Sequence, residues 1–318
     1  MRRGRFLRWS GGLVVLSAVA GYIVVQYDTG RAGAPGCKVV SGKGDGATYE
    51  FTPEQAVNAA TITAVGTARE LPERAVTIAL ATALQESALR NIEHGDRDSL
   101  GLFQQRPSQG WGTPEEIMDP AYAAGKFYEH LEEVPGYTRL PLTVAAQRVQ
   151  RSGFPQAYAK HEPDAALLAA ALTGRSAATL TCEGRPAATR ATGADAVRAA
   201  LARDFGRDAL EPAGAEVGAT SSPTVSAPAD SDGSGGSDGR TVRLPVTAEE
   251  GADAGARGWQ LAHWAVANAS ELRIKRVSYA GREWTAGHTD SRWRPTDDGK
   301  NAEGSADGAG VVTLTTMP

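Results

Sequence analysis

The sequence predicts a mainly α-helical protein, with an all-α domain over residues 51–210, a flexible linker over 211–241 and a small α/β domain over 242–318. Three observations support this organisation. Apolar residues in the first region recur at helical spacing between helix-start signals. The second region is rich in Gly, Ser, Asp and Pro and has almost no apolar content to form a core. The third region contains an amphipathic helix followed by β-strand patterns.

Helix-start signals divide the first region into segments. Thr52-Pro53-Glu54-Gln55 and Thr113-Pro114-Glu115-Glu116 each fit a capping box with Pro at the first helical position. Asp119-Pro120 opens a helix in the same way, and Gly174 is placed to end one. No strand-type alternation of any length is present, so we expect helices only. Their expected bounds are 53–69, 72–89, 120–133, 142–151, 162–173 and 192–204.

The third region has a different pattern. Trp259–Leu272 is amphipathic at helical spacing, which predicts a helix. Ile274–Tyr279 indicates a strand that is followed by an Ala280-Gly281 turn, and Val311–Thr316 indicates a last strand. These elements predict a small α/β domain of unknown role.

The N-terminal pattern indicates export. Residues 1–9 form a basic segment with four arginines, which we expect to be cytoplasmic, and 10–26 is mostly apolar. Apolar residues continue beyond the Ala18-Val19-Ala20 cleavage-type motif. This favours an uncleaved single-pass anchor in the cell membrane, with the bulk of the chain extracytoplasmic. Residues 27–50 would then form a stalk, and cleavage followed by secretion is the alternative.

The two cysteines, Cys37 and Cys182, flank most of the helical region. In an exported protein such a pair favours a disulfide. Closing a loop of this length contributes about 4 kcal/mol in the chain-entropy model. The alternative is a lipidated Cys37. The preceding Ala34-Pro35-Gly36 lacks the apolar residue that such lipidation signals need, so the disulfide is favoured.

Charge and residue spacing exclude some partners. A formal net charge of −4 and a pI near 5.8 give no basic footprint for nucleic acid. His94 with Asp96, and His161-Glu162-Pro163-Asp164, lack the spacing of a recognised metal site. We therefore expect no nucleic acid, no metal and no cofactor.

The chemistry of the helical region centres on Glu86. Helix 72–89 is apolar around most of its circumference, which indicates a core helix, and Glu86 shares a face with the small residues Ala79 and Ala83. A carboxyl group at the end of an apolar helix is partly desolvated, so it can keep the proton that a general acid donates. The alternative is an ordinary solvated glutamate at a helix end.

A polar turn follows Glu86 in the sequence. Gly101 permits close backbone approach, and the side chains of Gln104 and Gln105 can offer amide groups to sugar hydroxyls. Trp111, in Gln109-Gly110-Trp111-Gly112, can supply an aromatic platform. These features indicate a cleft for a glycan chain.

Glu86-Ser87, a variable loop and Gly101-Leu102-Phe103-Gln104 resemble the soluble lytic transglycosylases, which carry Glu-Ser and Gly-Leu-Met-Gln at this spacing. The helix with Ala124-Gly125 and Tyr128 also resembles that family, and the resemblance covers roughly residues 50–182. It implies a lysozyme-like fold with Glu86 as the single catalytic acid/base and Ser87 orienting it or contacting substrate. The expected substrate-binding residues are Ser87, Gln104, Gln105, Trp111, Tyr128 and Gln150.

One part of the chain departs from that family. Val149 and Gln150 stand where transglycosylases carry a Tyr and an Asn that face the catalytic Glu. Gln150 can keep a polar contact, but Val149 has no hydroxyl group, so the outcome of cleavage stays open between an anhydro-sugar and hydrolysis. Hydrolysis would use a second carboxylate, Asp96 or Asp98. The alternative is that the two aspartates belong to a loop held by an ion pair.

The C-terminal region is faintly similar to the end of exported domains related to zinc D-Ala-D-Ala carboxypeptidases. The similarity rests on Leu261–Ala269, Ile274–Val277, Arg282-Glu283-Trp284 and Trp293-Arg294-Pro295. Those domains finish with a His-x-His metal motif, where this chain has Asp307-Gly308-Ala309-Gly310. Because these ligands are absent from the sequence, we expect a wall-binding or spacer module rather than a zinc peptidase.

Together these patterns predict an exported, membrane-anchored lytic transglycosylase or muramidase that cleaves the β-1,4 bond between N-acetylmuramic acid and N-acetylglucosamine. Its expected partners are the glycan strands of peptidoglycan and, through the N-terminal helix, the cytoplasmic membrane. Two alternatives remain. One is a catalytically inactive peptidoglycan-binding protein, and the other is an envelope scaffold whose C-terminal domain binds a protein partner.

Overall fold

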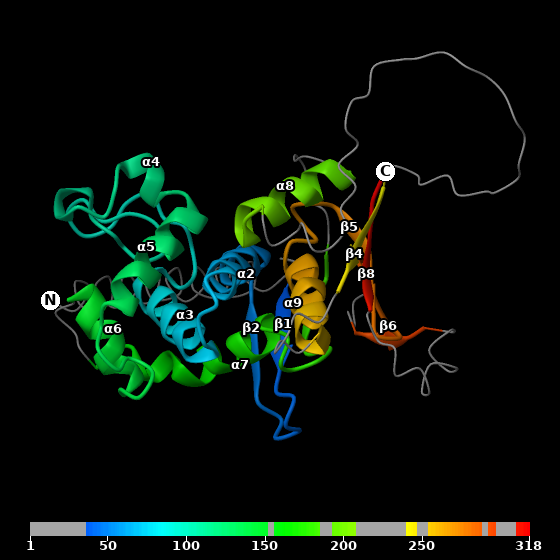
Figure 1. Ribbon diagram of the computed structural model, residues 1–318, viewed down its shortest axis with the longest axis horizontal. Helices are drawn as coiled ribbons and strands as arrows, with labels where there is room; N and C mark the ends of the chain where they lie inside the picture. Colours follow the sequence, from blue (N-terminus) through cyan, green and yellow to red (C-terminus); the bar gives the residue numbers. More distant parts are fainter. Residues whose placement is uncertain are drawn as a thin grey trace, which may run out of the picture. The chain divides into compact units, whose positions relative to one another are not determined.

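The computed structural model describes residues 36–151, 156–184, 193–207, 240–246, 254–287, 292–296 and 310–318. These residues form eight α-helices and eight β-strands in two antiparallel sheets (Figure 1). The fold is therefore mixed α/β, and the prediction of a mainly α protein with an all-α first domain is wrong. Residues 36–318 belong to one compact unit.

The first sheet joins the two ends of the helical region. Its strands are β1 (Cys37–Val40), β2 (Thr48–Phe51) and β3 (Leu180–Cys182), in the order β2-β1-β3. Cys37 lies opposite Cys182 in this register, and their sulfur atoms form a disulfide 2.00 Å long. The predicted disulfide is confirmed. The strands escape sequence analysis because three or four residues are too few to show alternation, and β1 and β2 lie in the stretch expected as a stalk.

The helices of this region agree closely with the predicted bounds. Each of the six predicted helices is present, with ends within two residues of those expected. Thr52 and Thr113 form the two predicted capping boxes, and Asp119 caps its helix by accepting from the backbone N–H groups of Ala121 and Tyr122. The helices are α2 (Pro53–Ala68), α3 (Glu73–Ser87), α4 (Pro114–Ile117), α5 (Pro120–Glu132), α6 (Leu142–Gln150), α7 (Glu162–Leu172) and α8 (Ala194–Phe205).

Helix α3 lies at the centre of the helical core. It packs against α2, α5, α6 and α7, and it is buried along almost its whole length. Surrounding it with apolar contacts offsets the conformational entropy lost on folding. Only the first and last turns of α3 reach the surface. Its C-terminal residues are therefore held on a rigid base.

The second sheet contains β4 (Thr241–Pro245), β5 (Ile274–Tyr279), β6 (Arg282–Thr285), β7 (Arg294–Pro295) and β8 (Val311–Thr316), in the order β4-β8-β5-β6-β7. Helix α9 (Ala254–Ala267) packs against β5 and β8 of this sheet (Figure 1). The same helix contacts α2, α7 and β3 of the helical region.

Tryptophan side chains connect the second sheet to the first. Trp284 Nε1 donates to the Cys182 carbonyl oxygen at 3.1 Å, and Trp293 Nε1 donates to that of Leu180 at 2.9 Å. Gly174, which follows α7 with φ +81°, permits the close approach of α9, because a Cβ there would lie 1.7 Å from the Ala256 carbonyl oxygen. The helical region and the C-terminal region are therefore joined by contacts that involve backbone atoms.

Some predictions fall on residues that the structure does not describe. The expected anchor at 10–26 and most of the expected linker at 211–241 lie outside the described residues. Within the described ranges no helix has the length and apolar character needed to cross a bilayer.

Candidate active site

Glu86 lies in the last turn of α3, where the helix reaches the surface. Its side chain is half-buried, whereas the adjacent Ser87 and the preceding turn are buried. The helix ends at Ala88, which adopts the left-handed conformation with φ 53°. A carboxylate is thus presented from a rigid apolar helix at the edge of the core.

Tyr158 holds this carboxylate. Its hydroxyl group donates to Glu86 Oε1 at 2.7 Å, and its ring is fully buried. Tyr158 lies just before the short 3-10 helix η2 (Ala159–His161), which follows α6 and precedes α7. Hydrogen bonds to a charged acceptor are stronger than neutral ones, so this contact fixes the orientation of the Glu86 side chain.

Tyr158 is not among the site residues predicted from the sequence. The resemblance to the transglycosylases places that family's tyrosine at position 149, where this chain has Val149, a buried part of the core. The structure brings a tyrosine hydroxyl to Glu86 from nine residues further along the chain. Tyr158 is the only tyrosine between Leu142 and Leu172, and this was the available signal.

Ser87 and Gln150 hold the turn that follows Glu86 in the sequence. Ser87 Oγ lies 2.8 Å from the carbonyl oxygen of Leu102, and Gln150 Nε2 donates to that of Phe103 at 2.7 Å. The turn is therefore attached to α3 on one side and to α6 on the other. Both side chains were predicted to contact substrate, and in the structure both bind the protein backbone.

Gln104 lies on this turn in the left-handed conformation, with φ 49°. Its Nε2 donates to the Gly101 carbonyl oxygen at 3.2 Å, and its side chain is half-buried. A Cβ at Gly95 would lie 1.7 Å from Gln104 Oε1, so the amide of Gln104 packs directly on the backbone of the 91–99 loop. Gln104 remains partly accessible, as a sugar-binding amide requires.

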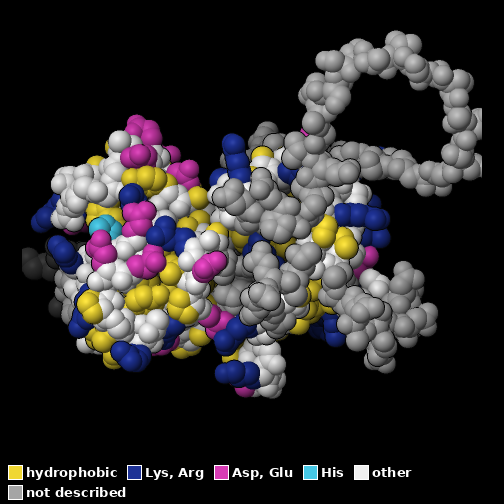
Figure 2. All heavy atoms as spheres, viewed as in Figure 1, with side chains coloured by type: hydrophobic (Ala, Val, Ile, Leu, Met, Phe, Trp, Pro, Cys, Tyr) yellow, Lys and Arg dark blue, Asp and Glu magenta, His cyan; other side chains and the backbone are white. Residues whose placement is uncertain are grey.

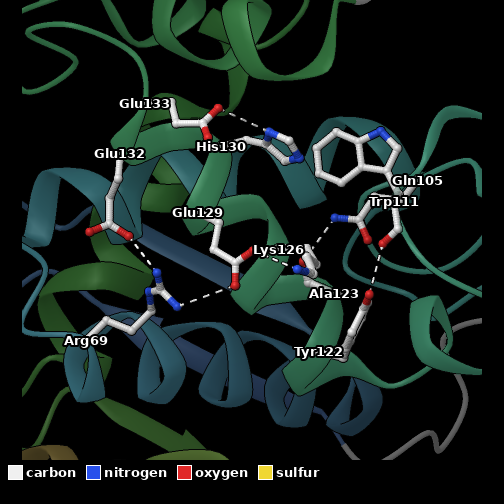
Figure 3. A network of polar contacts seen from close by, with 10 residues as sticks. All are labelled: Arg69, Gln105, Trp111, Tyr122, Ala123, Lys126, Glu129, His130, Glu132 and Glu133. Atoms are coloured by element: carbon white, nitrogen blue, oxygen red, sulfur yellow. Dashed lines mark hydrogen bonds and ion pairs between the residues drawn. The ribbon is translucent and has the colours of Figure 1, made fainter.

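Gln105 is buried instead. Its backbone pairs with Leu100 in both directions, and its Nε2 donates to the Ala123 carbonyl oxygen of α5 at 3.0 Å (Figure 3). Its Oε1 has no hydrogen-bond partner among the described residues. The structure thus places Gln105 between the turn and α5.

Trp111 lies beside α5, in the loop before α4. Its ring centroid is 4.4 Å from that of His130, and its carbonyl oxygen accepts from the Tyr122 hydroxyl at 3.3 Å (Figure 3). The side chain is half-buried. Gly112 gives room for this contact, because a Cβ there would lie 2.6 Å from Tyr122 Oη.

Tyr128 belongs to the core between α2 and α5. It is fully buried, its hydroxyl donates to the Ile62 carbonyl oxygen at 3.0 Å, and burial raises its pKa well above the usual value. At the surface of the same helix pair, Arg69 binds Glu132 at 2.7 Å and Glu129 at 3.9 Å (Figure 3). These contacts place Tyr128 in helix packing rather than at a surface.

The two loop aspartates differ. Asp98 Oδ1 accepts from Arg106 Nε at 2.7 Å and its Oδ2 from the backbone N–H of Ser108 at 2.9 Å. Hydrogen bonds from Ser108 and Arg106 hold the pKa of Asp98 well below its usual range. Asp96 has a side chain 94% exposed and lies 4.0 Å from Arg97. Asp98 therefore closes the loop onto the segment that begins η1 (Pro107–Gln109).

His161 contacts Gln85, the residue before Glu86. One of its ring nitrogens, Nε2, lies 3.2 Å from Gln85 Oε1. Burial, and then the charge of Lys160, lowers the pKa of His161 below its usual value. Through Tyr158 and His161, η2 and the turn before it contact two consecutive side chains at the end of α3.

The comparison with known families concerns only the C-terminal part of the chain. The family described as VldE, C-terminal domain, matches residues 210–305. This range begins after the segments that carry Glu86 and Tyr158, and it includes β4, α9, β5, β6 and β7. No curated protein matches the chain. The chain is thus similar to that domain over less than half of its length.

Proposed function

We propose that this protein cleaves the β-1,4 bond between N-acetylmuramic acid and N-acetylglucosamine in peptidoglycan, with Glu86 as the catalytic acid and base. The observation that carries the proposal is the contact between the half-buried Glu86 carboxylate and the buried Tyr158 hydroxyl. Glu86 Oε2 has no hydrogen-bond partner among the described residues, so it is available for proton transfer.

In the proposed reaction, protonated Glu86 donates its proton to the glycosidic oxygen as the bond from that oxygen to C1 of the muramic acid residue breaks. The resulting carboxylate is stabilised by the hydrogen bond from Tyr158. It then removes a proton from the hydroxyl group that attacks C1, and this restores protonated Glu86. Both halves of the reaction use the same side chain.

The attacking hydroxyl is proposed to be the 6-hydroxyl of the same muramic acid residue, which gives an anhydro-sugar. Hydrolysis with inversion needs a second carboxylate to activate water. Both oxygens of Asp98 already accept hydrogen bonds, and its lowered pKa makes it a weak base. Asp96 points into solvent. The contacts of both residues therefore favour the single-carboxylate route.

Several features of the helical region support binding of a glycan chain. The turn at Gly101–Gln105 is attached to α3 and α6, and a rigid turn limits the entropy lost when substrate binds. Gln104 offers an amide, and Trp111 offers a half-buried aromatic ring. Export and membrane anchoring, expected from residues 1–26, would bring the protein to this substrate.

Muropeptide analysis tests the proposal. Purified full-length chain is incubated with isolated cell walls, and the products are separated by mass. Anhydro-muropeptides are expected from the wild type, and from Glu115→Gln as a control at an exposed carboxylate of α4. New reducing ends would instead indicate a muramidase, and co-sedimentation without cleavage would indicate a binding protein. Any cleavage that survives Glu86→Gln would contradict the assignment of the acid.

A further inference from the structure

His161 and Tyr158 lie at the two ends of one tight turn, in which η2 (Ala159–His161) directly follows Tyr158. The backbone N–H of His161 donates to the Tyr158 carbonyl oxygen at 3.1 Å. A 3-10 helix has three residues per turn, so side chains three positions apart lie on the same side of it. Tyr158 is buried and His161 is half-buried, whereas Ala159 and Lys160 between them are exposed. Within this turn the Tyr158 and His161 side chains therefore face the rest of the protein.

These two side chains contact consecutive residues of α3. The Tyr158 hydroxyl donates to Glu86 Oε1 at 2.7 Å, and His161 Nε2 lies 3.2 Å from Gln85 Oε1. Consecutive side chains leave an α-helix about 100° apart, so the two contacts meet α3 at different points of its surface. A single hydrogen bond would leave the turn able to pivot about it. Two bonds at separate points fix the orientation of the turn as well as its distance from α3.

The contact with Gln85 defines which nitrogen of His161 carries the proton. An amide oxygen only accepts hydrogen bonds, so His161 Nε2 is the donor. A glutamine side chain carries an N–H donor the same number of bonds from the backbone as Nε2, whereas leucine fills similar space and has no donor. The substitutions His161→Gln and His161→Leu therefore differ chiefly in whether this hydrogen bond can form.

We propose that His161 is a positioning residue for the acid, Glu86: its hydrogen bond to Gln85 holds the turn that carries Tyr158, and this keeps the Tyr158 hydroxyl on Glu86 Oε1. His161 does not touch the reacting atoms and acts through Tyr158. Its role rests on the proposed function, in which Glu86 exchanges a proton with the glycan. Because a misplacement of about 1 Å can cost up to about 100-fold in rate, loss of the contact should be visible in the cleavage rate.

The kinetics of cleavage of soluble, uncross-linked glycan strands test this role. In His161→Leu the kcat is expected to fall about tenfold and the KM to stay within about twofold, because only the orientation of the acid changes. Gln85→Leu, which removes the acceptor, should give the same fall. His161→Gln is expected to restore kcat to within about threefold of the wild type, because its amide can donate to Gln85.

Two matched controls test whether the effect is specific to this contact. Lys160→Gln changes an exposed residue of the same turn, and Glu115→Gln changes one on α4, where Figure 2 shows Asp and Glu side chains gathered at the surface. Both variants should cleave at the rate of the wild type. Matching thermal melting curves of all variants exclude misfolding as the cause, and Gln85→Leu carries the test if His161→Leu does not fold.

A double variant separates positioning from an independent effect. Tyr158→Phe/His161→Leu should be no slower than Tyr158→Phe, because both changes remove the same support of Glu86. Losses that multiply would overturn the proposal, since His161 would then act without Tyr158. A raised KM with unchanged kcat in His161→Leu would also overturn it, because that result indicates direct contact with substrate. Wild-type values of both constants in His161→Leu would overturn it as well.

¹³C NMR of the full-length chain labelled at the tyrosine Cζ atoms detects the Tyr158 hydrogen bond without any cleavage. The Tyr158 signal is the one that disappears in Tyr158→Phe. It is expected to shift in His161→Leu and Gln85→Leu and to stay at its wild-type position in His161→Gln. A Tyr158 signal that does not shift in His161→Leu would overturn the role of His161. A wild type that cleaves no peptidoglycan would contradict the proposed function alone, because the NMR signal still decides the positioning.

Discussion

Glu86 and Asp204 are two carboxylates at the ends of helices, and their surroundings differ sharply. The Asp204 side chain is fully buried and accepts from three donors: Arg203 Nε at 2.7 Å, Trp264 Nε1 at 2.8 Å and Thr61 Oγ1 at 3.2 Å. Glu86 is half-buried and accepts from Tyr158 at 2.7 Å. Both oxygens of Asp204 accept hydrogen bonds from the protein. In Glu86 the protein occupies Oε1, and Oε2 is left for a substrate.

This difference distinguishes a carboxylate with a structural role from one that can act in catalysis. A buried carboxylate that is fully hydrogen-bonded connects elements, here α8 to α2 and α9, and has no capacity left for a substrate. A carboxylate held by one buried donor is oriented yet still able to exchange a proton. Burial alone therefore does not identify a catalytic acid, and the count of occupied oxygens is the more informative property.

Glu86→Gln should give the largest effect. The amide cannot donate a proton to the glycosidic oxygen, so the cleavage rate should fall by about 10³-fold or more. The free energy of unfolding should change by less than about 0.5 kcal/mol, because Gln can still accept from Tyr158. Muropeptide release and urea denaturation measure the two quantities. A large loss of stability would place Glu86 in the same class as Asp204.

Asp204→Ala should show the opposite behaviour. Removing the carboxylate leaves the donors of Thr61 and Trp264 buried and unpaired, so the free energy of unfolding should fall by about 3 kcal/mol. The cleavage rate per folded molecule should stay within about twofold of the wild type. Denaturation measures the free energy of unfolding. The cleavage rate is divided by the amount of folded protein, which is determined by a method that does not depend on activity. Loss of rate with normal stability would remove the distinction between the two carboxylates.

His263, on α9 one residue before Trp264, should make stability depend on pH. It is fully buried, Nδ1 lies 2.7 Å from the Ala171 carbonyl oxygen, and burial lowers the pKa of His263 to about 4. The unfolded chain binds a proton near pH 6.5, so stability should fall by about 3 kcal/mol as the pH drops from 6.5 to 4 and should not change through this group above pH 6.5.

Urea denaturation at a series of pH values measures this dependence. In the variant His263→Gln the fall between pH 6.5 and 4 should become shallower by about that amount. An identical pH profile in wild type and variant would show that His263 does not stay neutral in the folded state.

Tyr158→Phe should have the smallest effect of the four. The ring keeps its packing, and only the hydroxyl group that orients Glu86 is removed. The cleavage rate should fall about 10- to 100-fold, and stability by about 1 kcal/mol. A positioning role also predicts a changed pH profile of the cleavage rate, which a purely structural role would not give. An unchanged rate and profile would show that Glu86 needs no orientation by Tyr158.

The sequence predicted the elements that depend on local signals. Capping residues such as Thr52 and Asp119, with Pro at the next position, define the helices of the first region to within two residues. The central alternation of Ile274–Tyr279 and Val311–Thr316 predicted those two strands with their observed ends. Such signals act within a few residues and are readable without tertiary contacts.

The remaining elements depend on contacts distant in the sequence. Strand β3 has only three residues and pairs with β1, 145 residues away at the disulfide. Tyr158 reaches Glu86 across 72 residues, and its local sequence does not show which carboxylate it contacts. Similarly, Ser87 and Gln150 are polar residues beside a motif, and only the fold shows that they bind the carbonyl oxygens of Leu102 and Phe103.

The indole hydrogen bonds from Trp284 and Trp293 to the β3 carbonyl oxygens have a consequence for the integrity of the molecule. They attach the last part of the chain to the region between Cys37 and Cys182, which the disulfide closes into a loop. Helix α9 adds to this attachment through its contacts with α2 and α7. A single cut of the backbone between residues 207 and 240 should therefore leave two fragments that stay together during gel filtration. The C-terminal sheet would then behave as a bound subunit of the helical part.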